Sequence, residues 1–98
     1  MVHENGEFDA ACAAAAGEDA ALLAELRAAF RESAARQLDL MQRARCDGNW
    51  TMAAMRLKGL AASFHSKHLF SLAEEALDGA PSDPAVLRKI ERYLATLT

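Results

Sequence analysis

Residues 52–64 read MAAMRLKGLAASF, and this segment carries the clearest helical pattern in the middle of the chain. Successive residues of an α-helix are rotated by about 100°. With that rotation, one face of residues 49–64 collects the apolar side chains Trp50, Ala54, Leu57, Ala61 and Phe64. An apolar stripe of this width predicts a helix that packs this face against a core.

The opposite face of the same helix has an unusual composition. It carries two methionines beside Gly59, and a glycine inside a helix costs about 1 kcal/mol relative to alanine. A glycine on an exposed face leaves room for close approach, methionines form an adaptable apolar surface, and flanking cations suit an acidic partner. We therefore predict a partner-binding surface, the methionine face, made of Met52, Met55, Arg56, Lys58, Gly59 and Ala62. The alternatives are scattered exposed apolar residues without a role, or a patch covered by an N-terminal helix.

Helical patterns also fill the first half of the chain. Alanines favour a short helix over residues 8–16 that ends at Gly17. A long amphipathic helix of about 25 residues follows. Its stripe consists of Leu23, Leu26, Phe30, Ala34, Leu38 and Met41. The sequence Asp47-Gly48-Asn49 then predicts a tight turn.

Two more helices follow a break near residues 64–68. The first has Leu69, Leu72, Ala73, Ala76 and Leu77 on one face. Residues 78–84 (DGAPSDP) predict a loop, after which Ser82 or Asp83 can cap the last helix. Its stripe is Val86, Leu87, Ile90, Tyr93, Leu94 and Leu97. We therefore predict an all-α fold, an antiparallel four-helix bundle with a short additional N-terminal helix, in which residues 1–7 are disordered and residues 8–98 form a single domain.

Composition narrows the class of protein. The chain has 98 residues, 52% hydrophobic and 26% charged, which fits one globular domain. A net charge of −3 without a basic run argues against nucleic-acid binding. No segment resembles a secretory signal or is apolar enough to span a membrane, and Cys12 and Cys46 are too few for a disulfide framework. We expect a cytoplasmic protein with free thiols and no membrane association.

The central helix resembles a known signature. Residues 53–64 are similar to the motif Ala-His-x-Leu-Lys-Gly-x-x-x-x-Phe/Leu of histidine-containing phosphotransfer (HPt) domains of bacterial phosphorelays. The matching residues are Ala54, Leu57, Lys58, Gly59 and Phe64, and Met55 stands where the family has its phosphorylated histidine. The order of helices also follows the family across most of the chain. Trp50 replaces a usual leucine, and His65-Ser66 stand where the family has Gly-Ala.

This resemblance implies a function without catalysis. In the family, the face around the histidine docks a receiver domain, glycine leaves room for the phosphoryl group, and lysine faces the receiver's acidic pocket. The thioether of Met55 cannot form a phosphoramidate, so we expect a protein that is not an enzyme and needs no cofactor or metal. We also expect a monomer rather than a dimer. Its expected partner is the receiver domain of a response regulator or of a hybrid sensor kinase. The protein would block or sequester this receiver domain.

The sequence is also compatible with other functions. An active phosphotransfer protein would need another histidine, and the candidates are His65 and His68, since His3 lies in the polar N-terminus. A metal site at His65 and His68 lacks further ligands by spacing. A structural helical module could self-associate through the methionine face. Glu74 and Glu75 are adjacent on a helix, so their side chains diverge, and we expect both in solvent.

Overall fold

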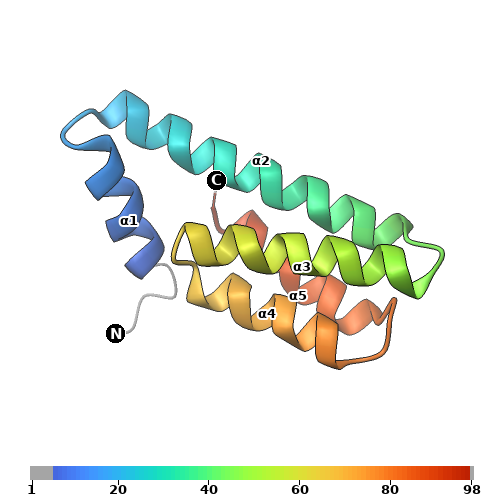
Figure 1. Cartoon of the computed structure of the whole chain (residues 1–98). Helices are drawn as coiled ribbons and strands as arrows, with labels where there is room; N and C mark the ends of the chain where they lie inside the picture. Colours follow the sequence, from blue (N-terminus) through green and yellow to red (C-terminus); the bar gives the residue numbers. More distant parts are fainter. Residues whose placement is uncertain (1–5, 98) are drawn as a thin grey trace.

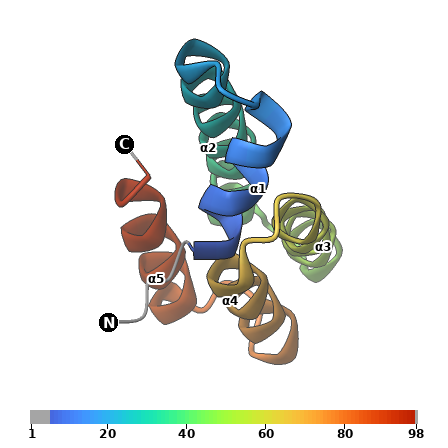
Figure 2. The same cartoon turned by 90° about the vertical axis from the view of Figure 1, so that its left-hand side faces the viewer.

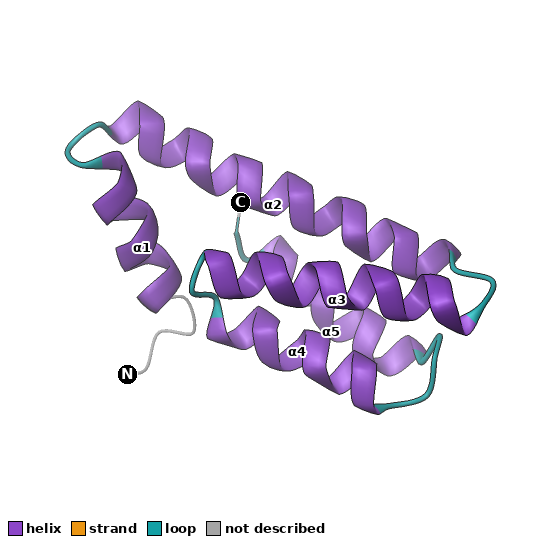
Figure 3. Ribbon diagram, viewed as in Figure 1, coloured by secondary structure: helices purple, strands orange, loops and turns teal. Residues whose placement is uncertain are grey.

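A computed structural model describes residues 6–97, and within this range the chain is all-helical (Figure 1, Figure 3). The helices are α1 (Gly6–Ala16), α2 (Ala20–Arg43), α3 (Asp47–Ser63), α4 (Lys67–Asp78) and α5 (Pro84–Ala95). The predicted all-α class is thereby confirmed. Most of the N-terminal segment predicted to be disordered, with His3, lies outside the described residues, whereas Gly6 and Glu7 already belong to α1.

The helices α2 to α5 pack side by side in a bundle-like arrangement. Helix α2 contacts α3 and α5, and α4 contacts the same two helices. Viewed from one end, the four helices surround a common centre, and α1 lies across that end (Figure 2). The predicted stripes of α2, α3, α4 and α5 supply the core side chains. Among residues 6–97, no helix combines the length and apolar character needed to cross a membrane.

Three phenylalanines join α1 to the rest of the molecule. The ring of Phe8 lies 4.6 Å from that of Phe30 in α2 and 6.3 Å from that of Phe64, centroid to centroid. Phe8 and Phe30 are fully buried, and Phe64 packs against this core while remaining partly exposed. Aromatic side chains bury large apolar areas, so this cluster explains why an alanine-rich helix docks here.

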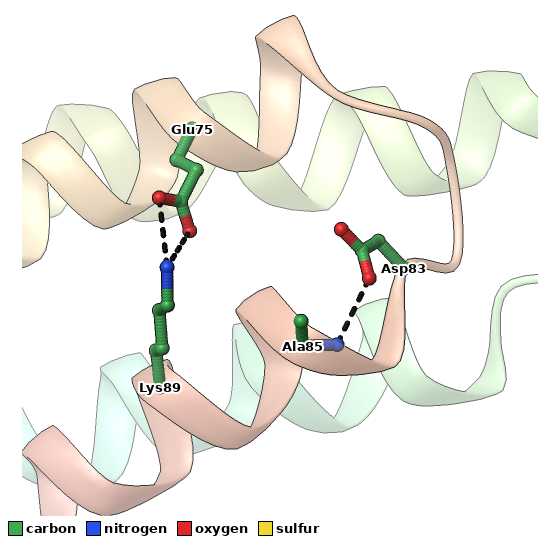
Figure 4. A network of polar contacts seen from close by, with 4 residues as sticks. All are labelled: Glu75, Asp83, Ala85 and Lys89. Carbon is green, nitrogen blue, oxygen red and sulfur yellow. Dashed lines mark hydrogen bonds and ion pairs between the residues drawn. The ribbon is translucent and has the colours of Figure 1, made fainter.

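Side chains and backbone conformation define the helix ends. Asp19 accepts hydrogen bonds from the backbone N–H groups of Ala21 and Leu22, at 3.0 and 3.1 Å, which caps α2. Of the two predicted caps for α5, Asp83 is used, and it accepts from the Ala85 N–H at 2.9 Å (Figure 4). Gly17 follows α1 with a φ of +65°, which confirms the predicted stop.

The predicted turn at Asp47-Gly48-Asn49 is wrong by a few residues. All three residues lie in the first turn of α3, and the connection after α2 is formed by residues 44–46. Cys46 is extended, with φ −142° and ψ 158°, and so marks the start of the helix. A carboxylate in the first turn, here Asp47, interacts favourably with the helix dipole, which favours helix over turn.

The connection between α3 and α4 is a Schellman motif. The Ser66 N–H donates to the Ala61 carbonyl at 2.8 Å, and the His65 N–H donates to the Ala62 carbonyl at 3.2 Å. These two bonds satisfy carbonyls at the end of α3 and require a left-handed residue between them. His65 takes that position with a φ of +56°, although glycine adopts it at lower cost.

Two buried polar contacts lock α4 in place. The Trp50 indole N–H donates to the carbonyl of Ala76 at 3.1 Å, one of the last carbonyls of α4, which have no partner inside the helix. The Ser66 hydroxyl lies 2.8 Å from the hydroxyl of Tyr93 in α5. Both contacts are buried, where an unpaired polar group is costly. Together they fix α4 against α3 and α5, and α3 carries the candidate site.

Candidate functional site

The two faces of α3 are separated as the sequence predicts. Its apolar stripe is buried, with Leu57 and Ala61 fully inaccessible, whereas 52% of Met52 and 60% of Met55 is exposed. Gly59 is also exposed, and a Cβ built there would meet no atom within 4 Å. Helix α1 therefore leaves the methionine face uncovered, which removes one of the alternative explanations for its composition.

Two shallow hollows lie on either side of Met55. The first is lined by Met52, Met55 and Arg56, together with residues of the first turns of α3. The second is lined by Met55, Lys58, Gly59 and Ala62 of α3 and by Phe70 and Leu77 of α4. All six residues of the methionine face thus line one of these hollows, and Met55 lines both. A partner that covers Met55 can therefore enter hollows on both sides of it.

Helix α4 contributes side chains to this surface that the sequence did not predict. Phe70 and Leu77 form the far wall of the second hollow, and both are only partly buried. The available signal was the spacing of Phe70, Glu74 and Leu77, at steps of four and three residues, which places them on one side of a helix. The sequence assigned Leu77 to the core instead, and no spacing argument could show that α4 borders the methionine face.

The two cations of the methionine face have different surroundings. The Lys58 ammonium lies 3.6 Å from a carboxylate oxygen of Glu74 and 5.2 Å from the centre of the Phe70 ring. Arg56 is exposed, and no carboxylate among residues 6–97 forms an ion pair with it. Glu74 and Glu75 are both exposed, as expected, and each also pairs with a lysine of another helix, Glu74 with Lys58 and Glu75 with Lys89. The first hollow is lined by the Asp47 carboxylate as well as by Arg56, so the two sides of Met55 differ in ion pairing rather than in net charge.

The histidines lie away from Met55. His65 is exposed at the α3–α4 connection, and His68 is half-buried with its ring 4.9 Å from the ring of Tyr93. Neither residue lines a hollow beside Met55. Within residues 6–97, no three His, Cys, Asp or Glu side chains form a group that could hold a metal ion.

The two cysteines are both free, as predicted, and differ in environment. Cys12 lies on the buried side of α1, against the core, and burial raises the pKa of its thiol. Cys46 is exposed just before α3. A thiol that stays protonated is a poor nucleophile, so Cys12 has a packing role.

Comparisons of the chain with protein-family models, with curated proteins and with solved structures each found no match. The methionine face is therefore the feature that bears on function: an exposed apolar strip between two hollows, with one cation, Arg56, that forms no ion pair within residues 6–97.

Proposed function

We propose that this chain is an HPt-like antiparallel four-helix bundle that binds receiver domains of two-component phosphorelays without accepting phosphate itself. One observation carries the proposal. Met55, at the position where the HPt signature has its histidine, is 60% exposed and lies between two hollows. An exposed apolar strip on a stable helix is suited to a protein partner.

Local geometry around the signature supports the family assignment. The signature has Gly-Ala after its final apolar residue, and here the corresponding residue His65 adopts the left-handed conformation that glycine favours. The retained Gly59 faces open space, as clearance for a docked partner requires. Short connections between successive helices from α2 to α5 support an antiparallel order.

The proposed mechanism is occupancy of the receiver. A receiver domain covered by the methionine face is unavailable to a true phosphotransfer protein. The Met55 thioether has no nitrogen lone pair and no titrating proton, so the phosphoryl group stays on the receiver. The protein acts as a competitor or a sequestering regulator, in the cytoplasm, and performs no reaction of its own.

Binding is tested with two matched substitutions. Ala62 in the second hollow and Ala35 on α2 are both exposed helical alanines, so Ala62→Arg and Ala35→Arg add the same charge and volume. We expect receiver domains purified from the source organism to bind the unaltered chain and the Ala35→Arg variant, with at least tenfold weaker binding to Ala62→Arg. Equal binding by both variants would exclude the methionine face as the docking site.

Phosphotransfer is tested by restoring the histidine. With a phosphorylated receiver domain as donor, a Met55→His variant is expected to acquire acid-labile phosphate on an imidazole nitrogen, while the unaltered chain acquires none and slows transfer to a true HPt domain. Acid-labile phosphate on the unaltered chain would instead favour an active protein that uses His65 or His68. No effect on transfer at saturating concentration would refute the competitor role.

Self-association is the second candidate, because Leu40 is also exposed near this face, at 42%. A groove that includes Leu40 and Met52 continues from α3 to α2. A symmetric dimer would place the two copies of this surface against each other, with each residue contacting a different residue of the other copy, so the two Arg56 charges need not meet. A concentration-dependent mass in sedimentation that Ala62→Arg abolishes would support the dimer.

A further inference from the structure

The lysines of this protein share one arrangement. Each of the three lysines of the sequence forms an ion pair with a glutamate of another helix. The pairs, by nitrogen–oxygen distance, are Lys58–Glu74 at 3.6 Å, Lys67–Glu7 at 2.8 Å and Lys89–Glu75 at 3.0 Å, the last drawn in Figure 4. The ammonium groups are therefore directed to contacts within the molecule.

The pair at Lys58 changes the charge of the methionine face. Its ammonium reaches from α3 to α4, where it contacts both the Glu74 carboxylate and the Phe70 ring. The carboxylate and the ring face are both favourable partners for a cation. A partner's carboxylate that approached Lys58 would have to displace Glu74 or accept repulsion from it. The second hollow, beside Gly59, is consequently apolar with little net charge.

Arg56 differs from Lys58 in this respect. Its side chain lines the first hollow beside Met52 and Met55. Asp47 lines the same hollow, but neither Asp47 nor any other carboxylate among the described residues forms an ion pair with Arg56. A guanidinium is permanently charged and offers several N–H donors in a planar fork, which suits two-point recognition of a carboxylate. Within the described part of the chain, Arg56 is thus the cation of the methionine face that forms no ion pair.

We propose that Arg56, and not Lys58, provides the electrostatic recognition of an acidic partner, and that Glu74 neutralises Lys58 at the edge of the second hollow. The partner then places an acidic group at the Arg56 end of the face and an apolar group over the hollow beside Gly59. The identification of this partner as a receiver domain rests on the function proposed above, whereas the state of Lys58 is a property of the isolated chain.

The state of Lys58 is tested without a partner. An amine-acylating reagent is applied to the unaltered chain and to the Glu74→Gln and Glu75→Gln variants, and the acylation rate of each lysine is followed by mass spectrometry. We expect Glu74→Gln to raise the rate at Lys58 alone by about two- to fivefold, the range that exposed ion pairs allow. Glu75→Gln is the matched control and should raise the rate at Lys89 alone. An unchanged rate at Lys58 overturns the restraint by Glu74.

The recognition role is tested with a purified receiver domain at low ionic strength, where charge effects are largest. We expect Arg56→Gln to weaken binding about tenfold and Lys58→Gln to change it less than about twofold. We expect Glu74→Gln, which frees Lys58, to strengthen binding, and Glu75→Gln to leave it unchanged. Equal losses for Arg56→Gln and Lys58→Gln, or no gain for Glu74→Gln, overturn the proposal.

The two proposals fail in different ways. If the unaltered chain binds no receiver domain, the proposed function and the recognition role of Arg56 both fall, and the acylation rates still decide whether Glu74 restrains Lys58. If a receiver domain binds but Arg56→Gln has no effect, the proposed function stands and this inference is refuted.

Discussion

Gly59→Ala should stabilise the protein and weaken its binding at the same time. Gly59 lies inside α3, and a Cβ built there meets no atom within 4 Å. The added methyl group therefore neither clashes nor becomes buried, and only helix propensity changes. The difference in helix propensity favours alanine by about 1 kcal/mol. For a domain of this size, that gain in stability raises the melting temperature by about 4–8 °C.

The assay is urea unfolding followed by circular dichroism, with Gly48→Ala as the control. A Cβ at Gly48 also meets nothing within 4 Å, but Gly48 lies in the first turn of α3, where the gain in propensity is smaller. We expect a free energy of unfolding that is higher by about 1 kcal/mol for Gly59→Ala and by less for Gly48→Ala. A loss of stability at Gly59 would contradict the open, helical environment assigned to it.

Binding of the same variant gives the functional half of the test. If a receiver domain approaches α3 closely at Gly59, the methyl group fills the space that the partner needs, and affinity falls although stability rises. A variant that is more stable and binds equally well would refute the idea that this glycine provides clearance for a partner.

Four further outcomes are expected. His65→Gly should raise the free energy of unfolding by about 1 kcal/mol, because a left-handed φ of +56° strains any residue with a Cβ; a lower midpoint in urea would contradict the motif. Trp50→Phe should cost about 1–3 kcal/mol in the same assay, because the Ala76 carbonyl loses its indole donor. A thiol reagent should modify Cys46 rapidly and Cys12 only when α1 opens, as mass spectrometry would show. Burial raises the pKa of Cys12 above its ordinary 9.0, so the unfolded chain loses this proton first. The contribution of Cys12 to the free energy of unfolding should therefore be constant below pH 9 and fall above it, and urea titrations above pH 9 should show a smaller loss of stability for Cys12→Ala.

Periodicity predicted the helices and their buried faces well. The stripe of α2 and the two sides of α3 follow from residue spacing alone, because packing selects the apolar side of each helix. The turn after α2 was misplaced because Asp, Gly and Asn are common both in turns and at helix starts. The extended backbone of Cys46 shows that residues 47–49 begin a helix.

The candidate site was predicted less completely, for a different reason. Spacing placed Met52 and Met55 together because both belong to one helix. Phe70 and Glu74 reach the same surface from α4, and their approach depends on how two helices pack. That packing is decided by buried contacts such as the Trp50 indole bond to Ala76, which no local pattern predicts.

The stability of the fold explains some residues of the methionine face and leaves others unexplained. Lys58 has a structural cause, since it joins α3 to α4 through Glu74. Met52 and Met55 are more than half exposed and therefore gain little from burial, and Gly59 lowers the stability of its own helix. A helix selected only for stability would carry alanine or a charged residue at these positions. The proposed partner, by covering them, would account for their presence beside Arg56, which has no ion-pair partner among residues 6–97.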